Sequence, residues 1–346
     1  MKSFTLFIRI GLPLCAILFI GVCRFVPLLA EEYAQVVYPV LSSVLSWGAS
    51  FLRFSLEEVF VIGVLLVLVF MPICKSRLGI TWKRIIVAEA EVIAWVYIWF
   101  YLGWGLNYFR YDIYTRMQVI PVSYDEQKFM DFLQAYTDSL NATYSTDVEI
   151  SEDIIFTEVQ NFYDKVYKEG GLLKLKSWQS PKYFTFTSLY SSVGVLGSMG
   201  PFFSEAQLNR DLLPLQLPFT YAHEVSHLLG VSSEAEANYW AYRACVESSS
   251  SSMRYCGYFG LLPYVISNAS SLLTEEDFRQ WINKVRPEVL EDYTRGRSYW
   301  QEKYSPLVGS MQEWVYNLFL KGNRISSGKK NYAEVIGILL SMKSES

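Results

Sequence analysis

The two histidines of the chain lie four residues apart and flank a glutamate, in the segment His223-Glu224-Val225-Ser226-His227. Residues i and i+4 of an α-helix share one face, so both imidazoles can present a nitrogen to a single metal ion. Glu224 projects about 100° around the helix from His223, beside the metal ion and not bound to it. From there its carboxylate can accept a proton from a metal-bound water. The spacing predicts a Zn²⁺ site with His223 and His227 as ligands and Glu224 as general base.

A catalytic zinc site also needs a third protein ligand, with the fourth position left to water. No histidine remains, so this ligand must be a carboxylate or a thiolate. The segment from 232 to 242 is typical of a helix, with Glu234 and Asn238 on one face at i and i+4. We predict that Glu234 is the third metal ligand and that Asn238 hydrogen-bonds a ligand histidine. Glu236 is the alternative ligand, although its spacing from Ser233 also suits a capping box.

The helix that carries the histidines should begin and end close to them. Pro218 suits a first helical position, and Gly230 suits a left-handed residue just after the helix. The opposite side of this helix is apolar, with Ala222, Val225 and Leu229, and should pack into the core. A pair of buried histidines satisfied by neighbouring polar groups is the alternative to a metal site.

The composition is unusually apolar for a soluble domain. Hydrophobic residues make up 51% of the chain, aromatic residues 16% and charged residues only 18%, whereas soluble domains average about 25% charged residues. This excludes a disordered chain and a disulfide-dense miniprotein. The formal net charge of −4 offers no basic footprint, so we expect no nucleic-acid partner.

The apolar residues concentrate in three runs within residues 1–105. The runs cover about 5–23, 56–74 and 85–105, and each is close to the ~20 residues that cross a bilayer as a helix. We therefore predict three transmembrane helices and a lipid bilayer as a partner. A cleaved signal peptide is the alternative for the first run, but no small-residue cleavage site follows it promptly.

The short loops predict the orientation of these helices. Between the second and third runs lie four cations and no acid, namely Lys75, Arg77, Lys83 and Arg84. Positively charged loops stay in the cytoplasm, and Lys2 and Arg9 place the N-terminus on the same side. Three crossings would then put residues 106–346 outside the cytoplasm.

Residues 106–346 are enough for one compact domain, which we expect to be mostly α with a small β element. The expected helices cover 124–140, the stretch from Ser151 to about 166, 274–284, 286–303, 308–321 and 331–342. Residues 183–187 alternate as a strand does and could offer an edge to a substrate backbone, although an ordinary core strand is the alternative. Cys245 and Cys256 could form a disulfide outside the cytoplasm or stay free thiols.

The histidine motif followed by Glu-x-x-x-Asn resembles the gluzincin arrangement of thermolysin-like and membrane-bound CAAX-protease-like enzymes. In those enzymes the glutamate of a Glu-x-x-x-Asp helix is the third zinc ligand. The resemblance places that ligand at Glu234, with Asn238 at the position of the usual aspartate. The connection from His227 to Glu234 is shorter than in those families.

Over nearly its full length the chain also resembles an uncharacterised bacterial family of multi-span membrane proteins with an outer zincin-like domain. The matching segments are 104–110, 200–209, 217–219, 223–230 and 234–238. The resemblance implies a multi-pass protein of the bacterial inner membrane with a large extracytoplasmic domain. Within the second segment we expect Glu205 and Asn209 to have a local capping or turn role, with the lining of a cleft as the alternative.

Taken together, these patterns predict a membrane-anchored, zinc-dependent metallopeptidase that hydrolyses a peptide or protein substrate outside the cytoplasm. The alternative is a non-catalytic membrane receptor or scaffold in which zinc only stabilises a zincin-like fold. A fourth protein ligand would favour the scaffold, because structural zinc sites are closed, whereas an open position would favour the enzyme.

Overall fold

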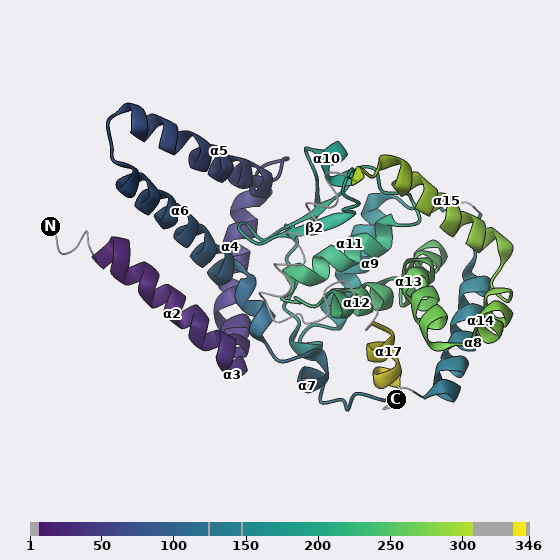
Figure 1. The fold of residues 1–346 in the computed structure, drawn as a ribbon. Helices are drawn as coiled ribbons and strands as arrows, with labels where there is room; N and C mark the ends of the chain where they lie inside the picture. The colour runs from purple at the N-terminus through teal and green to yellow at the C-terminus, as the bar shows by residue number, and fades with distance from the viewer. Residues whose placement is uncertain (1–6, 124, 147, 307–334, 344–346) are drawn as a thin grey trace. The chain divides into compact units, whose positions relative to one another are not determined.

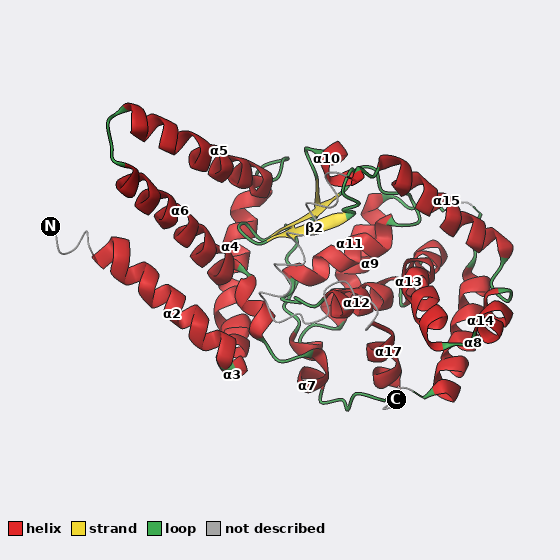
Figure 2. Cartoon of the chain, in the orientation of Figure 1, coloured by secondary structure: helices red, strands yellow, loops and turns green. Residues whose placement is uncertain are grey.

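A computed structural model describes residues 7–123, 125–146, 148–306 and 335–343. The described chain is mostly helical with one small sheet (Figures 1 and 2). It divides into two compact units. The first runs to Tyr111 and includes Gly200–Glu205, and the second comprises Asp112–Met199 and the residues from Ala206 onward. The predicted mostly α class is confirmed, and the boundary between the units lies a few residues after the predicted position 105.

Two helices of the first unit are long and apolar enough to cross a membrane, α5 (Leu56–Arg77) and α6 (Trp82–Gly103). They form an antiparallel hairpin (Figure 1). Apolar side chains of α5 are exposed along its length, as expected of a helix that faces lipid. Ser55 caps α5 by accepting a hydrogen bond from the backbone N–H of Glu58, and Lys75 and Arg77 lie in its last turn.

The first predicted span differs from the other two. A π-helical turn, η1 (Phe7–Gly11), leads into α2 (Leu12–Phe25), and the helix is interrupted at Val26, whose backbone is not helical. The chain continues as α3 (Pro27–Glu32), η2 (Tyr33–Val37) and α4 (Tyr38–Ser50). The two halves are bent by 112° and together are long enough for one broken span or a re-entrant loop. The break follows from Pro27, because the residue before a proline is disfavoured in the helical region.

The segment Gly200–Glu205 is held within the first unit by hydrogen bonds. Oε2 of Glu205 accepts from the Ser55 hydroxyl at 3.1 Å and from the backbone N–H of Glu57 at 3.0 Å. Nε1 of Trp99 donates to the carbonyl of Phe202 at 3.0 Å. Glu205 therefore satisfies orphan donors at the N-terminus of α5, which is the capping role expected for it.

The second unit contains the remaining described α-helices, and most of the expected ones are confirmed. They are α7 (Ile113–Met117), α8 (Glu126–Thr143), α9 (Glu152–Lys165), α10 (Thr187–Ser191), α11 (Leu217–Leu228), α12 (Glu234–Val246), α13 (Ser251–Leu272), α14 (Glu275–Ile282), α15 (Pro287–Lys303) and α17 (Val335–Lys343). The hydroxyl of Ser151 caps α9 as predicted. The expected helix at 308–321 and the start of the one at 331–342 lie outside the described residues.

The small sheet is drawn in yellow in Figure 2. Its three strands have the order β1-β3-β2. They are β1 (Lys182–Tyr183), β2 (Gly197–Gly200) and β3 (Glu205–Leu208), and β1 pairs with β3 in parallel. The predicted strand at 183–187 is wrong after Tyr183. The Thr187 hydroxyl donates to the carbonyl of Phe184 at 3.0 Å, and this bond belongs to a turn that leads into α10. The buried ring of Phe184 stacks on Tyr190 of that helix, whereas Phe186 is exposed, so the alternating residues do not share one buried face.

Cys245 and Cys256 are both free and buried in this structure. Burial raises the pKa of the Cys256 thiol to about 12 and that of the Cys245 thiol well above its ordinary value. Both thiols are therefore protonated and act as small apolar core side chains.

Candidate metal centre

Helix α11 carries both histidines and is buried along almost its whole length. Pro218 lies in its first turn and Gly230 follows it at φ 91°, both as predicted. Ala222 and Val225 are fully buried on the core side. The hydroxyl of Tyr163, from α9, donates to the carbonyl of Ala222 at 2.8 Å. The helix is therefore bounded by Pro218 and Gly230 and is held to α9 at its middle.

The structure brings His223, His227 and Glu234 together in a group that could hold a metal ion. Nε2 of His223 lies 3.1 Å from Oε2 of Glu234 and 3.2 Å from Nε2 of His227. The third separation, from Nε2 of His227 to Oε2 of Glu234, is 3.7 Å. Ligand atoms about 2.0–2.1 Å from a tetrahedral zinc ion lie about 3.3–3.4 Å from one another. The three atoms therefore fit zinc with little adjustment.

Among the residues that the structure describes, no other cysteine, aspartate or glutamate joins these three residues as a fourth ligand. Glu205 is engaged at the N-terminus of α5. The side chains of His223 and His227 are 11% and 7% exposed, and that of Glu234 is 21% exposed. Solvent therefore reaches the group best at Glu234.

The outer nitrogen of each ring is also held. Nδ1 of His223 lies 2.9 Å from Oδ1 of Asn238, and Nδ1 of His227 lies 2.7 Å from the carbonyl of Val231. Both partners accept hydrogen bonds, so each Nδ1 carries the proton and each Nε2 is left for a metal ion. Asn238 is where the sequence predicted it. Val231 was missed, because its backbone carbonyl reaches His227 only through the left-handed turn at Gly230.

The structure places Glu236 away from the histidines. Its carboxylate forms an ion pair with Arg116 of α7 and accepts a hydrogen bond from Nε1 of Trp240 at 3.1 Å. Its backbone N–H donates to the hydroxyl of Ser233 at 3.4 Å, which caps α12. The side chains of Arg116 and Glu236 are only 7% and 3% exposed. Glu236 therefore joins α7 to α12 through a buried ion pair.

Breaking this pair from the cationic side should destabilise the fold. Replacing Arg116 with methionine leaves the Glu236 carboxylate buried without its cation, which costs about 3–5 kcal/mol. We expect chemical denaturation to show that loss in the free energy of unfolding. Replacing Lys165, whose pair with Glu247 is mostly exposed, with methionine should cost less than about 1 kcal/mol. Similar losses for the two variants would contradict this interpretation.

Glu224 lies beside the ligand group and is 5% exposed. Burial raises the pKa of its carboxyl to about 6, a rise that the two histidines oppose and Glu234 reinforces. Burial lowers the pKa of His227, but the carboxylates of Glu234 and Glu224 outweigh it and raise that pKa to about 9. Burial raises the pKa of Glu234, but the hydrogen bonds and charges of His223 and His227 outweigh burial and hold that pKa well below its usual range. A dication would replace the proton on His227, because a ligand histidine must be neutral.

Strand β2 passes directly beside Glu224. A Cβ atom added to Gly197 would lie 2.6 Å from Cγ of Glu224 and 2.7 Å from its Oε1. Any larger residue at position 197 would therefore displace the Glu224 carboxylate from its present position. The carbonyl of Leu196, the residue before, accepts a hydrogen bond from the backbone N–H of Asn209 at 2.8 Å, which fixes the strand. Sequence reasoning did not identify Gly197, because this contact joins residues far apart in the chain.

Tyr264 of α13 is a second residue near the centre that the sequence did not single out. Burial and the charge of Glu234 raise the pKa of its hydroxyl to about 12, and Asn238 opposes that rise. The hydroxyl is therefore close to two residues of the centre and is a hydrogen-bond donor at neutral pH.

A family model described as "Protein of unknown function (DUF3810)" matches residues 33–340. The matched stretch includes α4 to α6, the histidine helix and Glu234. No curated protein and no solved structure matches the chain.

Proposed function

We propose that the chain, which belongs to the DUF3810 family of proteins of unknown function, is a membrane-anchored, zinc-dependent metallopeptidase with a zincin-like domain. One observation carries the proposal. Three ligand atoms meet at tetrahedral distances, no fourth ligand residue joins them among the described residues, and a buried glutamate stands beside them. An open coordination position with an adjacent base is the arrangement of a catalytic site.

The chain's own residues have separate tasks in this mechanism. A bound zinc ion would polarise the peptide carbonyl and lower the pKa of a coordinated water. Glu224 would take the proton of the attacking water and later return it to the leaving amine. Asn238 and Val231 keep the two imidazoles in the tautomer that leaves Nε2 free. The hydroxyl of Tyr264 is our candidate donor to the carbonyl oxygen as negative charge develops on it.

The activity is tested with the full-length protein in detergent. We expect it to cleave casein or a peptide library, to lose that activity on treatment with a zinc chelator and to regain it when zinc is added back. Zinc bound at one equivalent without any cleavage would instead support a zinc-stabilised receptor or scaffold.

The position of Glu224 against β2 gives a prediction for activity. Replacing Gly197 with alanine puts a methyl group where the carboxylate now lies, so the base must move by an ångström or so. A misplacement of that size costs about 100-fold in rate. We expect kcat to fall by about that factor while zinc content is unchanged. The control is Gly48→Ala in α4, where the backbone is helical and no atom lies within 4 Å of an added Cβ. Equal activity of Gly197→Ala and the wild type would contradict the assigned role of Glu224.

We further propose that the chain is a multi-pass protein of the bacterial inner membrane, with the second unit outside the cytoplasm. The support is the pair α5 and α6, together with the cations at the two helix ends that the loop joins, Lys75 and Arg77 in α5 and Lys83 and Arg84 in α6. Three crossings require the bent pair before α5 to cross once. An alkaline phosphatase fusion after residue 346 should be active, and one in the loop at 78–81 inactive. The reverse pattern would overturn this orientation.

A further inference from the structure

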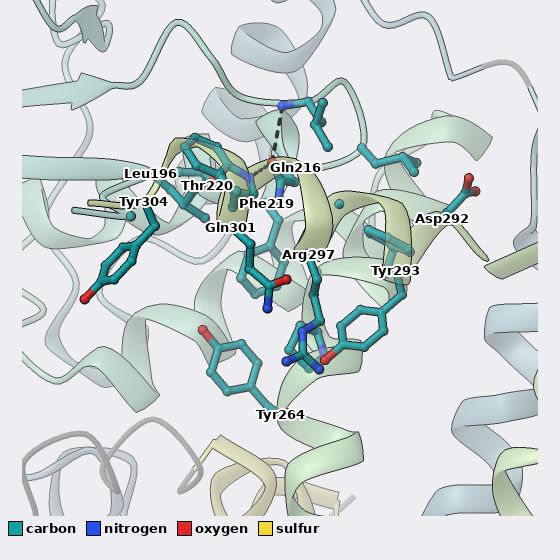
Figure 3. A pocket seen from close by; sticks show the side chains of 18 residues that line it. Leu196, Gln216, Phe219, Thr220, Tyr264, Asp292, Tyr293, Arg297, Gln301 and Tyr304 are labelled. Atoms are coloured by element: carbon teal, nitrogen blue, oxygen red, sulfur yellow. Dashed lines mark hydrogen bonds between the residues drawn. The ribbon is translucent and has the colours of Figure 1, made fainter. Parts of the chain in front are cut away.

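The second unit contains a cavity of about 490 Å³, within the range of about 300–1,000 Å³ of small-molecule sites. Helices α11, α13 and α15 and the loops before β2 and α11 form its walls (Figure 3). Most of the wall is apolar, with side chains that include Leu196, Leu213, Leu215, Phe219, Phe259 and Pro263. The residues of the metal centre are not part of this wall.

Three wall residues connect the cavity to the metal centre. Leu196 directly precedes Gly197, which lies against the Glu224 carboxylate. Thr220 lies on α11 one turn before Glu224. Tyr264 lines the cavity from α13, which packs against α11 and α12, the two helices that carry the ligand residues. These residues come from three separate elements, so we infer that the cavity lies next to the Glu224 carboxylate and the ligand group.

The polar groups of the cavity indicate which side chains it would accept. Arg297, Gln301 and Tyr264 extend into the same space from α15 and α13 (Figure 3). No acidic group forms a salt bridge with Arg297 among the described residues, and its guanidinium lies over the ring of Tyr293. The one carboxylate in the wall, Asp292, points away and pairs with Arg295 at 2.7 Å. The cavity therefore offers apolar contact and repels lysine and arginine.

We propose that this cavity binds the side chain of the substrate residue next to the scissile bond and selects large apolar residues such as phenylalanine, leucine and methionine. The proposal rests on the metallopeptidase function proposed above. A pocket of this kind discriminates by the apolar surface that it removes from water. Alanine at the same substrate position would leave most of the cavity unfilled.

Gly296 allows the cavity to be filled without disturbing the backbone. It lies in α15 and lines the cavity, and the nearest atom to an added Cβ is Cδ1 of Leu213 at 3.7 Å, an ordinary van der Waals distance. Replacing Gly296 with phenylalanine should occupy the space meant for the substrate side chain. Ser298 is an exposed residue of the same helix that does not line the cavity. Replacing it with phenylalanine adds the same bulk elsewhere and is the matched control.

The test compares two fluorogenic peptides that differ only by phenylalanine or alanine next to the cleaved bond, with full-length protein in detergent. We expect wild type and Ser298→Phe to cleave the phenylalanine peptide at least about 10-fold better by kcat/KM. Gly296→Phe should lose that preference while it cleaves the alanine peptide at near wild-type rate. The proposal is overturned if the wild type has no preference, if Gly296→Phe keeps it, or if both variants behave alike.

A binding measurement separates this proposal from the proposed function. The phenylalanine peptide, titrated into zinc-loaded Glu224→Gln by calorimetry, should bind at least about 10-fold more tightly than the alanine peptide. Adding Gly296→Phe to that variant should remove the difference. This outcome would support the cavity even if the wild type cleaved neither peptide, a result that would count against the metallopeptidase alone. Equal binding of the two peptides would overturn the cavity assignment whatever the activity.

Discussion

Replacing Glu224 with glutamine is expected to lower peptide hydrolysis by about 100- to 10,000-fold, the usual contribution of a positioned general base. Glutamine keeps the size of the side chain but cannot accept the proton of the attacking water. It also removes a buried carboxyl whose pKa, at about 6, suits proton transfer near neutral pH. The measurement is kcat/KM on a fluorogenic peptide, with zinc content determined on the same sample.

The control is the same substitution in a second buried glutamate. Glu236 lies on α12 but pairs with Arg116 and Trp240, outside the ligand group. Glu236→Gln should retain its zinc and its activity per folded molecule, at some cost in stability. Equal activity of Glu224→Gln and wild type would show that Glu224 is not the base. Loss of zinc from Glu236→Gln would indicate that Glu236 is a ligand.

The second large effect is expected at the third ligand. Replacing Glu234 with alanine removes the only carboxylate of the ligand group and leaves two imidazole nitrogens 3.2 Å apart. Loss of a residue that merely supports a ligand costs about 10- to 100-fold in metal affinity, so loss of the ligand itself should cost more than about 100-fold. Competition with a chromogenic zinc chelator measures the affinity directly.

In Glu234→Ala, added zinc should also no longer stabilise the folded protein. A ligand that binds only the folded state stabilises it by about 4 kcal/mol at 1,000 times its Kd. Zinc should therefore raise the unfolding temperature of wild type and of Glu236→Gln, but not that of Glu234→Ala at the same concentration. A wild-type zinc affinity in Glu234→Ala would show that the metal centre is built from other residues.

The local parts of this site could be predicted from the sequence, because each depends on residues close together in the chain. The start and end of α11 at Pro218 and Gly230 are such signals. So is the cap of α12 at Ser233. The spacing of Glu234 and Asn238 on one helical face indicated which of them could reach the histidines.

The parts that the sequence did not reveal depend on distant contacts. Nothing in the segment around Gly197 indicates that its Cα would lie against Glu224. The alternation at 183–187 is the same for a strand and for a turn into a short helix, and only the stacking of Phe184 on Tyr190, with Phe186 left exposed, distinguishes them. The cavity likewise combines side chains from helices far apart in the chain.

The most direct test of the account is diffraction from crystals of the zinc-loaded, full-length protein at the zinc absorption edge. The predicted result is one strong anomalous peak about 2.0–2.2 Å from Nε2 of His223, Nε2 of His227 and a carboxylate oxygen of Glu234, with a water in the fourth position. Imidazole rings that point apart with no peak between them would show that the two histidines do not form a zinc site. A fourth protein ligand closing the site would contradict the proposed catalysis.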